Sequence, residues 1–367
     1  MDRRSFLKKA AGTAAATGAV MATVSYPGKT THAQTRFRWK VASSFGITNP
    51  VTGPGLVRMT EDLKKMTGGK LDIKPFGAGE LVPAFGVFDA AKQGSIQMFY
   101  SASYYWAGKA PATQFTCSVP FGMNTQQTNA WMYHGGGLQL WHEFYAKHGL
   151  IGFPAGNTGT QMGGWFRKEI KSLDDYKGLK MRIPGLGGKV VEAVGGTVVL
   201  LASSDIYPSL ERGVIDACEW VGPLYDYALG LHQAAKYYYS PGWHEPSTMN
   251  ELSINKKAWD SLPKEFQEMI AHTAYKMNTD YLAEFDARNA GFVKKIKDYG
   301  VQFRQFPDDV MKGLSQAAAK IAEEVADKDP DARKIYDSFK SFQSEVRSWH
   351  NMNEVAYHMA LKAAGII

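Results

Sequence analysis

The order of strands and helices is the feature that most restricts the fold of this chain. Alternating apolar and polar residues predict a strand at 36–44, and apolar residues three and four apart predict a helix at 56–66. Further segments follow as a strand from residue 71, a short helix at 87–91 and a strand at 96–100. Strand, helix, strand, helix, strand predicts a parallel α/β sheet, in which ligands bind beyond the carboxyl ends of the strands.

The same alternation restarts beyond Asn157, which predicts a second lobe. Its expected elements are strands at 161–167, 178–183 and 197–201, a small helix at 187–195, and a helix N-capped by Asp205. Between the two units, residues 126–147 favour an aromatic-rich helix that the run His134-Gly135-Gly136-Gly137 ends or interrupts, followed by a buried strand at 149–155.

The C-terminal third predicts mostly helices. A strand at 251–255 is expected to return to the first lobe. Apolar residues at helical spacing then predict one long helix through 259–277, and two more within 320–367 that are broken near Pro330.

The first 33 residues have the pattern of an export signal. Arg3-Arg4 opens a twin-arginine motif, residues 10–24 form a weakly apolar stretch of small residues, and Thr31-His32-Ala33 offers a cleavage site. We therefore expect a periplasmic protein that leaves the cell by the twin-arginine route. No apolar run has the length needed to span a bilayer, so the mature chain is expected to be soluble.

Charge and cysteine content exclude some classes of function. The net charge of +7 falls to about +3 without the predicted signal, and no block of Lys and Arg remains to indicate nucleic-acid binding. The two cysteines, Cys117 and Cys218, do not resemble a disulfide framework, so two separate buried thiols are expected.

The usual catalytic motifs are missing from the sequence. There is no Gly-x-Ser-x-Gly elbow, and the glycines at 185–188 have neither phosphate-loop nor dinucleotide spacing. The nine histidines show no metal-ligand spacing, and neither cysteine belongs to a Cys-x-x-Cys pair. The sequence contains no nucleophile paired with a base.

Several runs of residues together resemble a known family. They are Gly69-Lys70-Leu71-Asp72-Ile73, Leu179-Lys180-Met181-Arg182-Ile183-Pro184-Gly185, and Ile206-Tyr207-Pro208-Ser209-Leu210-Glu211-Arg212-Gly213 through Asp216-Ala217. They resemble the solute-binding proteins of TRAP transporters, which are periplasmic importers independent of ATP. The runs at 131–137, 156–167 and 237–245 are similar to the 2-oxo acid-binding (TakP) branch and to calcium-lactate binders.

The resemblance implies a two-lobed α/β fold of the periplasmic-binding-protein type, with a cleft between the lobes and long C-terminal helices. The first lobe is expected to span 34–156 with a returning segment at about 248–300. The second lobe is expected to span 157–247 with the C-terminal helices at about 301–367. Membrane subunits of a TRAP transporter are the implied partners, and the C-terminal helices are implied to form a homodimer.

The resemblance also implies a ligand set. Arg182 is implied to pair with the substrate carboxylate, and Gln161 to contact both substrate and metal. Glu219, Glu245 and the backbone carbonyl of Trp220 are implied metal ligands. One position departs from the pattern, His244, where the 2-oxo acid relatives tend to carry a second tryptophan.

The residue types are suited to this chemistry. An arginine guanidinium matches a carboxylate with two parallel hydrogen bonds. Two carboxylates, an amide oxygen and a carbonyl suit Ca²⁺ or Na⁺. Such an ion would also bind the carboxylate and the 2-oxo or 2-hydroxy oxygen of the substrate, and would thereby select α-substituted monocarboxylates such as pyruvate and lactate.

Some roles stay open at this stage. Asn157 is expected either to touch the ligand or to shape the hinge, and Tyr104 and Tyr105 either to cover the core or to contact the ligand. Two other functions compete with the receptor: a periplasmic metal-assisted hydrolase that uses Glu219 and Glu245, and an adaptor that binds no ligand.

Overall fold

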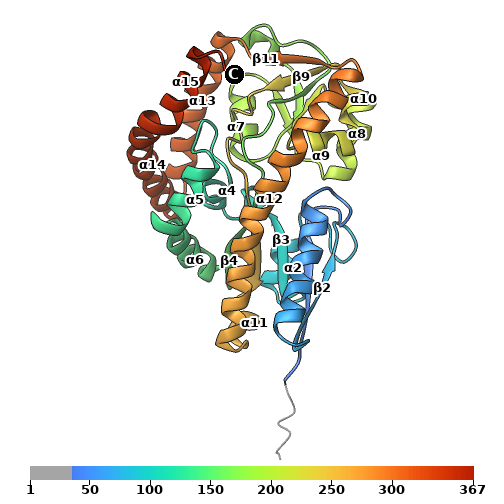
Figure 1. The fold of residues 1–367 in the computed structure, drawn as a ribbon, viewed down its shortest axis with the longest axis vertical. Helices are drawn as coiled ribbons and strands as arrows, with labels where there is room; N and C mark the ends of the chain where they lie inside the picture. Colours follow the sequence, from blue (N-terminus) through green and yellow to red (C-terminus); the bar gives the residue numbers. More distant parts are fainter. Residues whose placement is uncertain (1–34) are drawn as a thin grey trace, which may run out of the picture. The chain divides into compact units, whose positions relative to one another are not determined.

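The computed structural model describes residues 35–367, which contain two β-sheets with helices packed against them (Figure 1). The predicted export signal, residues 1–33, lies outside the described residues. Within 35–367, none of the helices combines the length and the hydrophobicity that crossing a bilayer requires. The two-lobed α/β fold expected from the sequence is confirmed.

The first sheet contains five strands. In spatial order they are β2 (Leu71–Phe76), β1 (Phe37–Ser43), β3 (Met98–Ala102), β10 (Met249–Asn255) and β4 (Leu150–Asn157). Strand β1 pairs in parallel with β2 and β3, as predicted. The returning strand is also confirmed, but β10 is antiparallel to both β3 and β4, so the sheet is mixed rather than parallel.

The second sheet contains six shorter strands. In spatial order they are β11 (Gln302–Gln305), β9 (Tyr237–Ser240), β5 (Gly164–Phe166), β8 (Ala217–Cys218), β6 (Lys180–Arg182) and β7 (Thr197–Val199). Strands β6, β7 and β8 run parallel, whereas β5 is antiparallel to its neighbours β8 and β9. The sequence pattern predicted β5, β6 and β7 but gave no sign of the other three.

Helices of the first unit follow the predicted pattern, except that α4 was not predicted. They are α2 (Thr52–Met66), α3 (Val87–Lys92), α4 (Thr113–Cys117), α5 (Thr125–His134) and α6 (Gly137–Lys147). The expected aromatic-rich helix is interrupted where the glycine run predicted, between α5 and α6. A reciprocal capping box between Asn124 and Gln127 begins α5, one residue before the predicted start.

Helices of the second unit are short, and one predicted cap is wrong. They are α7 (Gly185–Ala193), α8 (Ser203–Glu211), α9 (Pro223–Ala228) and α10 (Leu231–Ala234). The N-cap of α8 is Ala202, so Asp205 lies inside the first turn instead of capping it. An acid in the first turn still interacts favourably with the positive end of the helix dipole.

The predicted long helix after the first sheet is two helices. Helix α11 (Lys256–Asp260) ends before Pro263, which occupies the N-cap of α12 (Lys264–Asp298). A proline lacks the N–H of a helix interior, and this explains the break. Helix α12 packs against β4, a strand of the first sheet, and against α2. It also packs against α9 of the second unit, so α12 extends along both units (Figure 1).

The C-terminal helices divide between the two sheets. Helix α13 (Asp308–Asp327) packs on α7 and α14 (Pro330–His350) packs on α4, α5 and α6, with the predicted break at Asp329-Pro330 confirmed. The Asp329 side chain accepts a hydrogen bond from the Ala332 backbone N–H and caps α14. The exact lobe boundaries stay a prediction.

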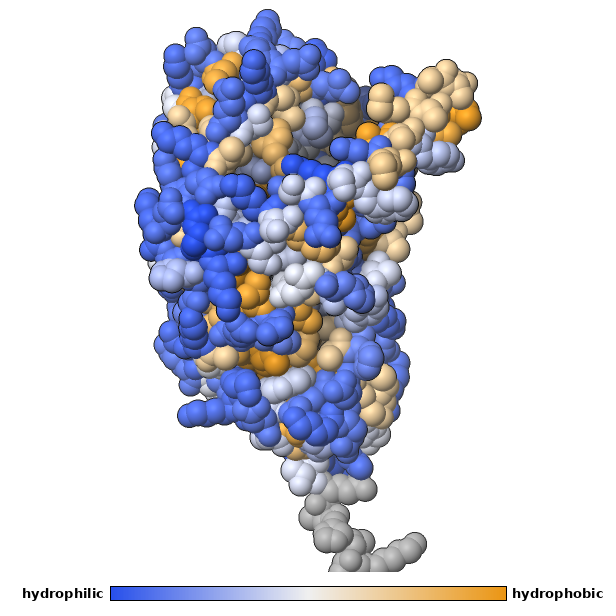
Figure 2. Space-filling view, turned by 90° about the vertical axis from the view of Figure 1, so that its left-hand side faces the viewer, coloured by the Kyte–Doolittle hydropathy of each residue, from blue (hydrophilic) through white to orange (hydrophobic). Residues whose placement is uncertain are grey.

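The chain ends in a π-helical turn (Asn351–Val355) and helix α15 (Ala356–Ala363), neither of which has a buried residue. Apolar side chains are therefore exposed here: Trp349, Met352, Val355, Tyr357, Met359, Ile366 and Ile367. Figure 2 shows the side of the molecule on which α14 and α15 lie in Figure 1, and hydrophobic residues gather on a projection at its upper right.

Both cysteines are buried and unpaired, as expected. Cys117 ends α4 and Cys218 ends β8.

Candidate binding site

Two chain segments connect the sheets and lie side by side. One leads from β4 to β5 and the other from β9 to β10. Backbone hydrogen bonds join them: the Gln161 N–H donates to Glu245 O at 3.1 Å, and the Gly242 N–H donates to Gln161 O at 2.8 Å. A Cβ at Gly242 would lie 2.4 Å from Gln161 O, so only glycine permits this approach. The pairing places Gln161 and Glu245 next to each other although 84 residues separate them.

Arg182 and Glu219 come from neighbouring parallel strands. Arg182 is the last residue of β6, and its register partner is Cys218, the residue before Glu219. Both side chains are buried, and the Arg182 guanidinium forms an ion pair with the Glu219 carboxylate. The expectation that Glu219 is buried with a partner is confirmed. The pair lies at the carboxyl ends of parallel strands, where the fold class predicts ligand contacts.

The guanidinium of Arg182 has most of its donors already in use. Nε donates to Leu201 O at 3.2 Å, and Nη1 donates to Glu219 O at 3.1 Å as well as to the Glu219 carboxylate. Nη2 is buried and has no hydrogen-bond partner among residues 35–367. The Trp220 ring packs over the guanidinium, 4.8 Å from Cζ to the ring centroid. Arg182 therefore has one nitrogen left for a ligand, Nη2, whose two N–H groups have no partner among residues 35–367. The pairing of Arg182 with a substrate carboxylate stays a prediction.

The charge of Arg182 is stabilised by its surroundings. Burial, the largest single influence, would lower its pKa, but Glu219, Tyr105, Tyr104 and Glu245 together outweigh burial, and the pKa is raised above its usual value. The guanidinium is therefore cationic at any physiological pH.

Gln161 and Glu245 form the second half of the site. Gln161 Nε2 donates to Glu245 Oε2 at 2.7 Å, and it also lies 3.1 Å from each of the hydroxyls of Thr158 and Thr248. Gln161 Oε1 is buried without a hydrogen-bond partner in the part of the chain that the structure describes. Burial and the Glu219 carboxylate together raise the pKa of Glu245 to about 7. An amide oxygen without a donor beside two acids is an environment that a cation would stabilise.

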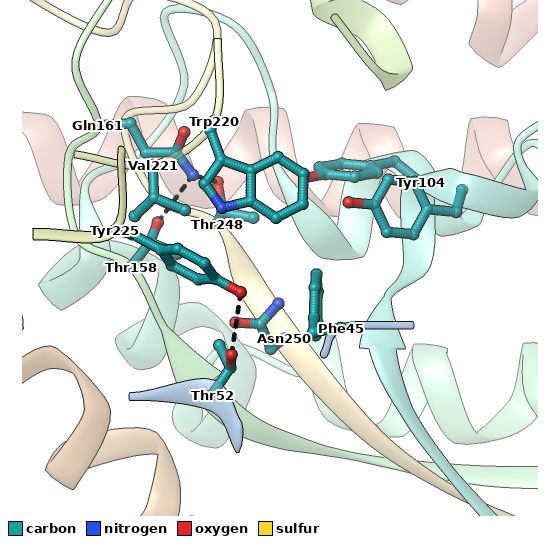
Figure 3. A pocket seen from close by; sticks show the side chains of 11 residues that line it. Phe45, Thr52, Tyr104, Thr158, Gln161, Trp220, Val221, Tyr225, Thr248 and Asn250 are labelled. Carbon is teal, nitrogen blue, oxygen red and sulfur yellow. Dashed lines mark hydrogen bonds between the residues drawn. The ribbon is translucent and has the colours of Figure 1, made fainter. Parts of the chain in front are cut away.

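A small cavity opens between these groups and the first lobe. Figure 3 shows the Trp220 indole with Gln161 on one side and Tyr104 on the other. The cavity is lined by Phe45, Thr52, Tyr104, Tyr105, Thr158, Gln161, Trp220, Val221, Tyr225, Thr248 and Asn250. The volume of the cavity that is open to the centre of a water molecule is only about 20 Å³. That is room for one or two waters, so an acid the size of pyruvate requires the walls to move.

Tyr104 and Tyr105 both line the cavity, from the 3₁₀ turn Ser103–Trp106 that follows β3. Gly185, at the start of α7, has a φ of +60°, and a Cβ there would lie 3.0 Å from the Tyr104 Cβ. Burial raises the pKa of Tyr105 while the Arg182 cation acts to lower it, so both hydroxyls are neutral donors near the charged groups.

The far edge of the cavity was not predicted from the sequence. The hydroxyls of Thr52 and Tyr225 lie 3.2 Å apart, and next to them Asn250 Oδ1 is buried without a hydrogen-bond partner within 35–367 (Figure 3). Only Phe45 carried a usable signal, because it lies just beyond the carboxyl end of β1. Trp220 was assigned only through its carbonyl, and its ring contact with Arg182 was missed.

Asn157 does not line the cavity. Its Oδ1 accepts from the Thr125 hydroxyl at 2.9 Å and from the Gly159 N–H at 3.0 Å, and its Nδ2 donates to the Ser247 hydroxyl at 2.9 Å. Of the two roles left open by the sequence, this geometry favours shaping the hinge, because Asn157 ties α5 to both connecting segments. A ligand contact by Asn157 stays a prediction.

The residues present fit a bound cation. One ligand atom from each of Glu219, His244 and Glu245 lies within 4.8 Å of the others, and all three side chains are buried. Gln161 Oε1 adds an unpartnered oxygen from the adjoining segment. Two carboxylates and an amide oxygen are donors that Ca²⁺ and Na⁺ accept.

Comparison with known proteins identifies the family. Residues 45–329 match the profile of bacterial extracellular solute-binding protein family 7, called DctP. The chain belongs to that family. The chain is 41% identical to a monocarboxylate 2-oxoacid-binding periplasmic protein of Nostoc sp., and the match covers 97% of this chain and 98% of the relative.

Solved structures of the DctP family are similar throughout. A TRAP solute-binding protein of Bordetella bronchiseptica, with calcium and picolinate bound, is 37% identical, with a TM-score of 0.88 over 90% of this chain and 98% of the other. A TRAP solute-binding protein of Pseudoalteromonas atlantica, with sodium and pyruvate bound, is 40% identical, with a TM-score of 0.85 over 88% of this chain and 99% of the other.

Proposed function

We propose that this DctP-family protein is the periplasmic receptor of a TRAP transporter. It captures a small 2-oxo or 2-hydroxy monocarboxylate, of the pyruvate and lactate class, together with Na⁺ or Ca²⁺, and delivers the acid to the membrane subunits. The observation that carries this proposal is the pair of buried atoms without a partner among residues 35–367, Arg182 Nη2 and Gln161 Oε1. Gln161 lines the small cavity, and the Arg182 guanidinium packs against the ring of Trp220, which lines it too. The Nostoc relative, named for 2-oxo acids, and the pyruvate-bound neighbour support the substrate class.

The two free groups divide the recognition between them. With Nη2 as its one nitrogen without a partner, Arg182 can hold an oxygen of a carboxylate. The second carboxylate oxygen and the 2-oxo or 2-hydroxy oxygen then remain for a cation held by Glu219, Glu245 and Gln161. This division explains why a metal ion is needed and why an acid without an α-oxygen would bind poorly.

The remaining site residues have proposed supporting roles. The Trp220 carbonyl completes the cation's oxygen ligands, and its ring holds the guanidinium plane by stacking. Tyr104 and Tyr105 contact the bound acid from the first lobe, so the site is complete only when the lobes close. Because the cavity is so small, we propose that the acid enters an opened form that bends at the connecting segments around Gln161 and Gly242.

Calorimetry with pyruvate tests the proposal. Protein treated with a chelator and transferred to a Na⁺-free buffer should bind pyruvate only after Ca²⁺ or Na⁺ is restored. It should bind propionate at least about tenfold more weakly, because propionate lacks the α-oxygen. Equal binding of pyruvate and propionate, or binding that does not depend on a cation, would overturn it. Nothing in the comparisons supports the alternative of a metal-assisted hydrolase.

The route of export is a separate proposal. The Arg3-Arg4 pair followed by a weakly apolar stretch supports twin-arginine transport of residues 34–367. Replacing both arginines by lysine should retain the precursor in the cytoplasm, as seen by cell fractionation. Normal export of that variant would contradict the route but not the receptor function.

A homodimer through the C-terminal helices is also proposed. The exposed apolar residues of the π-helical turn and α15 support it, and the Bordetella neighbour is described as a dimer. Light scattering should give twice the chain mass for the full chain and the single mass for a chain that ends at residue 348.

A further inference from the structure

His244 lies among the acids of the cation site. Its side chain is buried, and its ligand atom lies within 4.8 Å of those of Glu219 and Glu245. The expected ligand set contained only oxygen atoms, and the role of His244 is not explained by that set.

The contacts of His244 are incomplete within the protein. Nε2 lies 3.4 Å from Glu219 Oε2, and Nδ1 is buried without a hydrogen-bond partner among the described residues. A distance of 3.4 Å exceeds the usual range of about 2.7–3.2 Å for an N–H···O hydrogen bond. A buried imidazole with one long contact is costly unless something else occupies its lone pair or its N–H.

The distance of 3.4 Å is the separation expected for two atoms that coordinate the same ion. Two ligand atoms that each lie about 2.4 Å from an ion, at a right angle to each other, are about 3.4 Å apart. The Glu219 carboxylate can supply one of these atoms, because its Oε1 pairs with Arg182 while its Oε2 faces His244. Gln161 holds Glu245 through Nε2, and the Oε1 of the same amide is buried without a partner among residues 35–367, which gives a second and independent sign that a ligand belongs here.

We propose that His244 is a ligand of the cation at this site. The resulting set of two carboxylates, one imidazole, one amide oxygen and the Trp220 carbonyl binds divalent cations that accept nitrogen, of the Mn²⁺, Co²⁺ and Zn²⁺ class, more tightly than Ca²⁺. Imidazole suits these transition ions, whereas Ca²⁺ and Na⁺ favour oxygen. The inference rests on the proposed cation-assisted receptor function, and it assigns to that function a cation class and a residue that determines it.

Metal binding without any organic acid tests this inference. Chelator-treated protein is titrated with Co²⁺ and with Ca²⁺ by calorimetry, and visible absorption and the proton NMR spectrum of the Co²⁺ form are recorded. We expect Co²⁺ to bind at least about tenfold more tightly than Ca²⁺, with a hyperfine-shifted imidazole N–H resonance that identifies a histidine ligand.

Two matched substitutions separate the role of His244 from general effects. His244→Gln should weaken Co²⁺ binding by about 10- to 100-fold and remove the shifted resonance, while Ca²⁺ affinity changes less than about threefold. His272→Gln, at an exposed histidine of α12, should change neither affinity. Thermal unfolding with Ca²⁺ present checks that both variants are folded, and His244→Phe, of similar size, replaces His244→Gln if that variant fails.

The outcomes distinguish this inference from the proposed function. Unchanged Co²⁺ binding in His244→Gln, or an equal loss of Ca²⁺ and Co²⁺ affinity, overturns the assignment of His244 as a nitrogen ligand. Pyruvate is then added to the Ca²⁺ and Co²⁺ forms of the wild-type protein. Failure of pyruvate to bind either form overturns the receptor proposal, whereas the Co²⁺ titration still decides the role of His244.

Discussion

Two networks of hydrogen bonds surround buried carboxylates, one at Asp226 and the other at Glu219 and Glu245. They differ in whether every polar atom has a hydrogen-bond partner. Asp226 is fully paired: Oδ1 accepts from the Val221 and Gly222 N–H groups at 3.0 Å each, and Oδ2 accepts from Trp165 Nε1 at 2.9 Å and Tyr238 OH at 2.7 Å. In the network of Glu219 and Glu245, by contrast, Arg182 Nη2, Gln161 Oε1 and His244 Nδ1 have no partner within residues 35–367.

The difference separates structure from function. Leaving a buried polar atom unpaired costs about 1–3 kcal/mol, so a folded protein keeps such atoms where something else completes them. The Asp226 network is complete inside the chain and fixes the β5, β8 and β9 region. The Arg182 network is incomplete within the described part of the chain, which indicates that a ligand completes it.

The largest expected effect comes from Arg182→Lys. A lysine keeps the charge near Glu219 but cannot reach Leu201, Glu219 and a carboxylate at once. We expect pyruvate affinity to fall by about 100-fold, corresponding to about 3 kcal/mol, as measured by calorimetry with Ca²⁺. Arg58→Lys, at an exposed arginine of α2, should leave the affinity unchanged. Wild-type affinity in Arg182→Lys would remove the main difference between the two networks.

Glu251, a buried acid outside both networks, gives a pH-dependent test. Burial raises the pKa of Glu251 to about 8, while hydrogen bonds from Ser253 and Tyr145 oppose the shift. Between about pH 4.5 and 8 the folded protein keeps this proton and the unfolded chain does not, so the free energy of unfolding falls as pH rises through that window.

Glu251→Gln should remove about 3 kcal/mol of that fall between pH 5 and 8, measured by urea unfolding at both values. Its pyruvate affinity should stay near that of wild type, because Glu251 does not line the cavity. Parallel pH profiles for the two proteins would show that Glu251 is ionised in the folded state.

Asp226→Asn tests the complete network directly. In the variant, the asparagine NH₂ group replaces one carboxylate oxygen. If it replaces Oδ2, Trp165 and Tyr238 lose the oxygen to which they donate. We expect a loss of about 2 kcal/mol in the free energy of unfolding, with pyruvate affinity within about threefold of wild type. An affinity loss as large as that of Arg182→Lys would make Asp226 part of the binding site.

The smallest effect is expected at the far edge of the cavity. Asn250→Ala removes a buried, unpartnered oxygen and adds space beside Thr52 and Tyr225. Pyruvate affinity should change by less than about threefold, whereas 2-oxo acids with longer apolar side chains should gain up to about tenfold, or about 1.4 kcal/mol. A panel titration of acids of increasing length checks this. A uniform loss for all acids would show that Asn250 contacts the shared part of the ligand.

Much of the fold could be predicted because its signals are local. Apolar spacing located β1, α2 and α3, and the helix break at Asp329-Pro330 follows from proline chemistry. The strands β8, β9 and β11 were missed because two to four residues are too few to show alternation. The prediction of a single long helix was wrong because the helical spacing of apolar residues continues across Pro263, whereas the helix itself is broken there.

The sequence by itself determined the order of elements and the chemical types gathered for the site: an arginine, two glutamates and an amide. Only the tertiary structure decided which atoms of those groups are still free. Only Nη2 of Arg182 is free within residues 35–367, because Nε donates to Leu201 and Nη1 donates to Glu219. The Asn157 side chain already forms hydrogen bonds with Thr125, Gly159 and Ser247. Several of these hydrogen bonds join residues far apart in the chain, so no local pattern could reveal them.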